Sequence, residues 1–270
     1  MILQTLLQQT PPLISILILI LLLHHHPQLA PLRPLLPSTS LTLEPLLPDQ
    51  IYLIRNFFPS TLCKTYTSFL ASLPLTTTPG KPKKGDAVRV NDRFQIQDER
   101  FAEMLWSQTA LRELVMHPDG YDYDYGSYED GDGDEEREQK KNDHDVKHTW
   151  GGDPLGLNAN IRIYRYSKGQ FFAQHYDDSN TLTFTRPNDP PRAGRTTWTL
   201  LIYLTGCEGG ETVFYPEATR ANRNPAPVSV APEPGMALLH RHGDRCMLHE
   251  GKEVRQGEKW VLRSDLVVAR

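Results

Sequence analysis

The chain has 270 residues, of which 39% are hydrophobic and 23% are charged, and its formal net charge is -4. This length can bury the core of one large or two small domains, and no basic run is long enough to suggest nucleic-acid binding. Three widely spaced cysteines, Cys63, Cys207 and Cys246, exclude a disulfide scaffold and a CxxC zinc pair.

The first 48 residues differ in composition from the rest of the chain. They are rich in leucine and proline, and the first acidic residue is Glu44. Within them, residues 13–23 form an apolar run that would reach about half of a ~30 Å hydrocarbon core. That length suits a signal peptide or short membrane anchor, which would direct the chain to the endoplasmic reticulum or a membrane. Residues 1–10 lack the lysine and arginine that normally begin a signal peptide. The alternative is therefore a leader without targeting function, in which case the protein would be cytoplasmic.

Residues 49–270 are expected to form the folded domain, beginning with two helices. Apolar residues recur at helical spacing over 61–73, and Ser60 is the expected N-cap. Asp98 is expected to cap a second helix. Its apolar face would contain Phe101, Ala102, Leu105 and Trp106.

Residues 119–147 are predicted to be a disordered acidic insertion. Ten acids and one base, Arg137, lie between positions 119 and 138. Such a segment cannot bury enough apolar surface to offset the entropy lost on ordering.

The catalytic core is expected over 150–270, where short apolar runs alternate with glycine and proline. Short strands with helices only upstream predict an antiparallel sandwich or barrel. The predicted strands are 159–166, 170–176, 197–204, 211–215, 227–230, 235–240, 245–250 and 258–268.

A His-x-Asp pair, His175 and Asp177, ends one of these strands. Residues two apart on a strand point to the same face, so the two side chains should converge. Two histidines and one carboxylate form a facial triad for non-haem Fe(II), and His249 is the candidate for the second histidine. His240 and His242 are nearby alternatives. By itself such a pair is more often a surface hydrogen-bonding pair, and the same ligands also suit a zinc hydrolase.

Five motifs surround this pair in a fixed order. They are YSKGQFFAQHYD from Tyr166, TLLIYL from Thr199, GGETVF from Gly209, PGMALL from Pro234 and HEG from His249, which is followed by Lys259 and Trp260. The series resembles the catalytic domain of prolyl 4-hydroxylases and related Fe(II)- and 2-oxoglutarate-dependent dioxygenases over 158–268. The resemblance implies a mostly β (α+β) fold: a double-stranded β-helix, or jelly roll, with N-terminal helices packed on one sheet.

The resemblance also implies a role for each matching residue. His175, Asp177 and His249 would be the iron ligands, and Lys259 would bind the distal carboxylate of 2-oxoglutarate. Tyr166 and Thr199 would line the cosubstrate site. The His249-to-Lys259 spacing matches the family, whereas the spacings from His240 and His242 do not.

Arg263 is the rival of Lys259 for the distal carboxylate. The two residues share a strand face but lie about 13 Å apart along it, so only one can serve that carboxylate. If 245–250 and 258–263 pair as a hairpin, Lys259 faces His249. That register favours Lys259 and leaves Arg263 to pair with an acid such as Asp265 or to lie near the substrate.

The implied activity is hydroxylation of a substrate C–H by O2, with 2-oxoglutarate converted to succinate and CO2. The expected cofactors are Fe(II), 2-oxoglutarate as cosubstrate and L-ascorbate as reductant of over-oxidised iron. The substrate would be peptidyl proline or another protein residue. A small-molecule hydroxylase and a catalytically silent jelly-roll binding protein are the alternatives. No nucleic-acid partner is expected, and a membrane would be contacted only through the leader.

Overall fold

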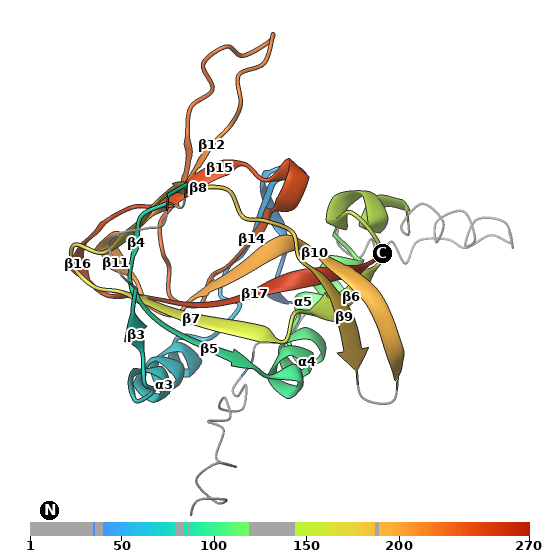
Figure 1. Ribbon diagram of the computed structural model, residues 1–270, viewed down its shortest axis with the longest axis horizontal. Helices are drawn as coiled ribbons and strands as arrows, with labels where there is room; N and C mark the ends of the chain where they lie inside the picture. Colours follow the sequence, from blue (N-terminus) through green and yellow to red (C-terminus); the bar gives the residue numbers. More distant parts are fainter. Residues whose placement is uncertain (1–34, 36–39, 79–83, 86, 119–143, 187–188) are drawn as a thin grey trace, which may run out of the picture. The chain divides into compact units, whose positions relative to one another are not determined.

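Two antiparallel sheets face each other in the computed structural model, which describes residues 35, 40–78, 84–85, 87–118, 144–186 and 189–270 (Figure 1). The major sheet has the order β1 (Glu44–Leu47), β2 (Ile51–Ile54), β14 (Ala237–Arg241), β10 (Asp189–Tyr203), β17 (Lys259–Ala269), β7 (Asn160–Tyr166), β5 (Asp92–Gln97) and β3 (Thr76–Thr77). On this sheet, β6 (Pro154–Leu157) pairs with β17, and β9 (Thr181–Arg186) pairs with β10.

The minor sheet has the order β13 (Val228–Val230), β12 (Thr212–Tyr215), β15 (Leu248–Gly251), β8 (Phe171–His175) and β4 (Arg89–Val90). From β7 onward the chain alternates between the sheets, because β7, β10, β14 and β17 belong to the major sheet and β8, β12, β13 and β15 to the minor sheet. This alternation is the double-stranded β-helix expected from the sequence, and the fold class is confirmed.

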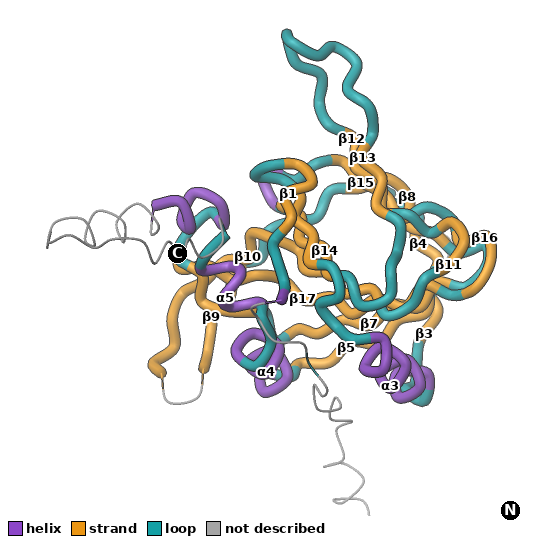
Figure 2. The backbone as a smooth tube through the Cα atoms, turned by 180° about the vertical axis from the view of Figure 1, so that it is seen from behind, coloured by secondary structure: helices purple, strands orange, loops and turns teal. Residues whose placement is uncertain are grey.

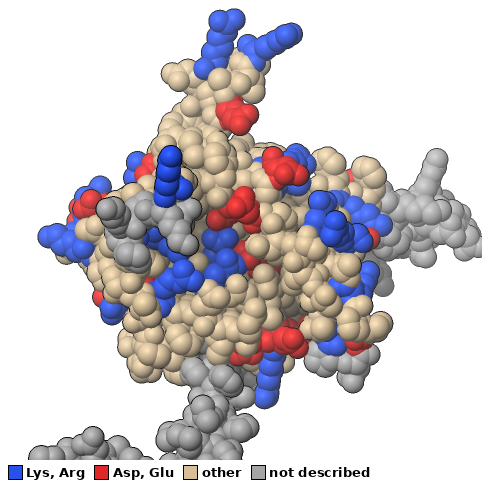
Figure 3. Space-filling model, in the orientation of Figure 1, with Lys and Arg blue, Asp and Glu red and all other residues tan. Residues whose placement is uncertain are grey.

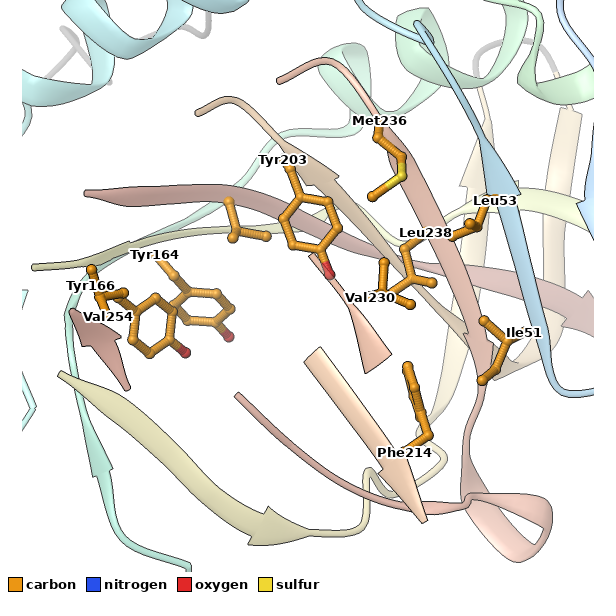
Figure 4. Close-up of a cluster of buried hydrophobic side chains, with 11 residues drawn as sticks. Ile51, Leu53, Tyr164, Tyr166, Tyr203, Phe214, Val230, Met236, Leu238 and Val254 are labelled. Carbon is orange, nitrogen blue, oxygen red and sulfur yellow. The ribbon is translucent and has the colours of Figure 1, made fainter. Parts of the chain in front are cut away.

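Strand alternation separates the two faces of the major sheet. On β7, Ile161 and Ile163 are fully buried on the outer face, whereas Tyr164 and Tyr166 point into the space between the sheets (Figure 4). Tyr203 of β10 and Phe214 of β12 line the same interior and are also fully buried. This interior therefore has tyrosines on the major-sheet side.

Three helices, α3 (Ser60–Ala71), α4 (Glu99–Ser107) and α5 (Leu111–Met116), lie along the outer side of the major sheet (Figures 1 and 2). The Asp98 cap is confirmed, since its carboxylate accepts a hydrogen bond from the Phe101 N–H at 2.8 Å. The Ser60 cap is wrong by one residue. Pro59 is the N-cap because its carbonyl already accepts the Cys63 N–H at 3.1 Å, which leaves Ser60 inside the helix.

The domain extends beyond two of the expected boundaries. Strand β1 precedes residue 49 and pairs with β2, although its Glu-Pro-Leu-Leu sequence resembles the leader. Residues 144–147 were expected in the acidic insertion, but they begin a helix over 144–150 in which Val146 and Trp150 are buried. Burial of these two apolar side chains supplies the stabilisation that composition alone did not indicate.

The hairpin between 245–250 and 258–263, which was the condition for placing Lys259 opposite His249, does not form. Strand β15 pairs with β8 and β12, whereas β17 pairs with β7 and β10 in the other sheet. The connection contains its own strand, β16 (Val254–Gly257), which pairs with β11 (Cys207–Gly209). Lys259 therefore lies opposite Tyr166, not opposite His249.

Among the described residues, the longest apolar helix is too short to cross a bilayer. The apolar run 13–23 and residues 119–143 of the expected insertion lie outside the described residues.

Candidate functional site

His175, Asp177 and His249 meet between the two sheets. His175 ends β8 and lies directly opposite His249 of β15 in the strand register. The His175 Nε2 atom lies 3.8 Å from Asp177 Oδ1, and the His249 Nε2 atom lies 3.9 Å from Asp177 Oδ2. One donor atom from each of the three residues lies within 4.8 Å of the others, a spacing that suits one metal ion.

Both imidazoles present the correct nitrogen for a metal. The Nδ1 atoms of His175 and His249 contact the carbonyls of Ala173 and Met247 at 2.8 and 2.9 Å, so Nδ1–H donates and the Nε2 lone pair faces Asp177. Burial lowers the pKa of His175 to about 4 and also lowers the pKa of His249. Two neutral imidazoles and a carboxylate fit the donor set of non-haem Fe(II).

The Asp177 carboxylate is held by two neighbours. Arg263 Nη2 lies 2.9 Å from Oδ2 and Nη1 lies 3.2 Å from Oδ1, while the Thr199 hydroxyl donates to Oδ2 at 2.9 Å. Burial would raise the pKa of Asp177, but the Arg263 guanidinium and the surrounding histidines together outweigh burial and hold this pKa well below its usual range. Asp177 is therefore ionised and fixed in orientation.

Lys259 is a buried cation at the far side of the same interior. Its Nζ atom donates to the Gly210 carbonyl at 2.7 Å and lies 5.7 and 5.3 Å from the ring centres of Tyr166 and Tyr203. No carboxylate of the described residues forms an ion pair with it, and burial lowers its pKa to about 8. Such a site favours an incoming anion, because a charge-assisted hydrogen bond would replace the missing counter-ion.

One cavity of about 50 Å³ brings most of the predicted site residues together. Its lining includes the three candidate metal ligands together with Tyr166, Lys259 and Arg263. On the face of the molecule shown in Figure 3, basic and acidic side chains lie next to one another near the centre. Thr199 does not line this cavity but lies behind Asp177, where it also contacts His242 Nδ1 at 3.0 Å.

His240 is a site residue that sequence reasoning set aside. Its Nε2 atom lies 3.8 Å from Asp177 Oδ2, its ring centre lies 4.6 Å from that of His249, and it lines the cavity. Its parity with Leu238, which belongs to the interior cluster, would have indicated that it faces inward. His242, two residues further along the chain, points instead to Thr196 and Thr199.

Residues 161–264 match the model of the 2OG-Fe(II) oxygenase superfamily. This match spans β7 to β17 and contains all the site residues described above, and it confirms the family resemblance. No curated protein matches the chain.

Several solved structures are similar to this chain at low identity. The viral collagen prolyl hydroxylase of Paramecium Bursaria Chlorella virus-1 is 15% identical over 82% of this chain and 97% of its own, with a TM-score of 0.44. A Pseudomonas putida prolyl-4-hydroxylase is 12% identical over 82% and 94%, with a TM-score of 0.45. A Trichoplax adhaerens prolyl hydroxylase, in complex with a hypoxia inducible factor peptide fragment, is 17% identical over 81% and 83%, with a TM-score of 0.45.

Proposed function

We propose, from the match of residues 161–264 to the model of the 2OG-Fe(II) oxygenase superfamily, that this protein is a dioxygenase that hydroxylates a substrate C–H. Its products would be succinate, CO2 and the hydroxylated substrate. One observation carries the proposal: a facial set of two neutral imidazoles and one carboxylate shares a cavity with a buried lysine that has no carboxylate partner among the described residues.

His175, Asp177 and His249 would hold Fe(II), which supplies the oxidation of the substrate C–H by O2 with electrons from 2-oxoglutarate. Lys259 would bind the distal carboxylate of 2-oxoglutarate, and the rings of Tyr166 and Tyr203 around its ammonium would exclude water. The contacts of Arg263 with Asp177 and Asp265 support a different role for it, which is to orient the carboxylate ligand. Thr199 would assist in the same role through its hydroxyl.

The proposed substrate is a peptidyl proline or another residue of a protein, and a small-molecule hydroxylase is the alternative. L-ascorbate is the proposed reductant that sustains repeated turnover. A silent binding protein or a zinc hydrolase would leave the buried Lys259 without a function, because neither needs a cation for a second carboxylate.

The proposal is tested by succinate formation from 2-oxoglutarate with Fe(II) and O2, first without substrate and then with peptide and metabolite collections. We expect slow uncoupled turnover that requires Fe(II) and a substrate class that accelerates it. Failure of the Fe(II) protein to bind 2-oxoglutarate under nitrogen, judged from the absence of a visible charge-transfer band, would contradict the oxygenase assignment.

The buried Lys259 predicts a pH dependence for 2-oxoglutarate binding. Its pKa in the unliganded protein is about 8, and only the protonated ammonium attracts the carboxylate. The apparent Kd should therefore be constant below about pH 7 and rise about tenfold per pH unit above pH 8, as the proton is lost. Titration of the Fe(II) protein under nitrogen measures this. Lys259→Arg should remove the dependence, because a guanidinium stays protonated over the range, and an equal dependence in this variant would assign the titration to another group.

A further inference from the structure

A second, larger cavity of about 550 Å³ lies outside the metal site. It is bordered by α4, by the turn between β6 and β7, and by β9, and the two views place β9 and α4 next to each other (Figures 1 and 2). Amide and hydroxyl side chains dominate its polar lining, among them Gln97, Asn158, Asn160, Asn180, Thr183 and Thr185. These groups both donate and accept hydrogen bonds, as a peptide backbone does.

Strand β9 borders this groove with a free edge. It pairs with β10 on one side, and no strand of the described residues pairs with its other side. The Thr196 N–H donates to the Asn180 carbonyl. In an antiparallel pair the backbone groups of successive residues point alternately toward and away from the partner strand. The backbone groups of Leu182 therefore point toward β10, and those of Thr181 and Thr183 point toward the free edge. Consecutive residues 182–185 all line the groove, as expected when the edge of a strand and not one face borders it.

Two buried polar atoms in the groove lining lack a hydrogen-bond partner among the described residues. They are Asn160 Oδ1 and Arg162 Nε, an acceptor and a donor. Asn160 and Arg162 both belong to β7 and share a strand face, and their backbone positions are about 6.6 Å apart along the strand. Because buried polar groups are normally paired, these two atoms favour a ligand with alternating donors and acceptors.

The groove connects to the metal site through charged side chains. Arg162 pairs with the buried Asp265, which pairs with Arg263 at 3.4 Å, and Arg263 pairs with Asp177. In addition, β9 begins four residues after Asp177. A chain that lies along β9 would therefore lead toward the candidate metal ligands.

We propose that the groove binds an extended polypeptide substrate, which adds a strand to the free edge of β9. The proposal rests on the oxygenase function and names the substrate class and the docking site for it. Backbone groups of Thr181 and Thr183 would pair with every second residue of the substrate. Proline is tolerated at the intervening positions, because its missing N–H would point away from β9.

The experiment uses the full chain with Fe(II), 2-oxoglutarate, O2 and a positional-scanning decapeptide library, with succinate as the readout. The most active decapeptide is then compared in the parent and in Thr183→Pro, which removes one N–H from the free edge without breaking the β9–β10 ladder. We expect KM for the peptide to rise about fivefold, as the loss of one backbone hydrogen bond of about 1 kcal/mol predicts. The 2-oxoglutarate charge-transfer band verifies that the variant is folded.

A second measurement does not depend on the variant. Each backbone amide of the active decapeptide is N-methylated in turn, and KM is determined with the parent protein. Pairing with β9 predicts an alternating pattern, in which N-methylation raises KM strongly at every second position and changes it little at the positions between them. The insensitive positions serve as matched controls for the sensitive ones.

Three results would overturn the proposal. The first is that no decapeptide accelerates succinate formation, and the second is that the N-methyl scan shows no alternation in KM. The third is that Thr183→Val, which keeps the backbone N–H, raises KM for the peptide as much as Thr183→Pro does. Failure of the oxygenase function itself is distinguished from these results, because the parent protein would then form neither succinate nor the 2-oxoglutarate charge-transfer band.

Discussion

Alanine in place of His175, Asp177 or His249 is expected to abolish Fe(II)-dependent succinate formation. Each substitution removes one of the three donors that converge within 4.8 Å, and the remaining two cannot retain the metal. The same variants should lose stabilisation by metal. A metal present at one hundred times its Kd stabilises the folded protein by about 2.7 kcal/mol, which thermal unfolding with and without Mn(II) measures as a shift in Tm.

Two controls separate ligation from general damage. His148→Ala changes an exposed imidazole and should leave both turnover and the metal-dependent Tm shift intact. His242→Ala changes a buried imidazole that faces Thr196 and Thr199, and it should retain metal binding and turnover. His240→Ala is likewise expected to stay active. Full activity in the His249 variant together with loss in the His240 variant would transfer the ligand assignment to His240.

Lys259→Ala is expected to raise the Kd for 2-oxoglutarate by one to two orders of magnitude while leaving Fe(II) affinity nearly unchanged. A charge-assisted hydrogen bond to a desolvated carboxylate contributes about 1.5–3 kcal/mol, and each ~1.4 kcal/mol is tenfold in affinity. Lys259 does not contact the candidate iron ligands, because its hydrogen bonds go to Gly210 and Thr212. Anaerobic titration that follows the charge-transfer band measures the effect.

Lys252→Ala is the matched control, since this lysine is exposed, pairs with Glu250 and does not itself line the cavity. Lys259→Arg should recover only part of the affinity, because a planar guanidinium and a compact ammonium fill the site differently. Arg263→Ala should change 2-oxoglutarate binding less than Lys259→Ala does. The reverse order, with parent-like binding in Lys259→Ala and failure in Arg263→Ala, would assign the distal carboxylate to Arg263.

Local pattern was sufficient for much of the fold and of the candidate site. The period of two along a strand predicted that His175 and Asp177 converge, and it placed Lys259 and Arg263 on one inward face. The positions of most core strands and the Asp98 cap also followed from apolar runs and turn residues near each element. These features depend on residues a few positions apart, so the sequence by itself determined them.

Pairing between distant strands was decided only by the tertiary structure. Nothing local to 245–263 indicates that β15 and β17 lie in opposite sheets, because that choice depends on which apolar faces the whole chain buries together. The same long-range packing places Arg263 on Asp177. It also leaves β9 with a free edge, because only the arrangement of all strands decides which backbone groups stay unpaired.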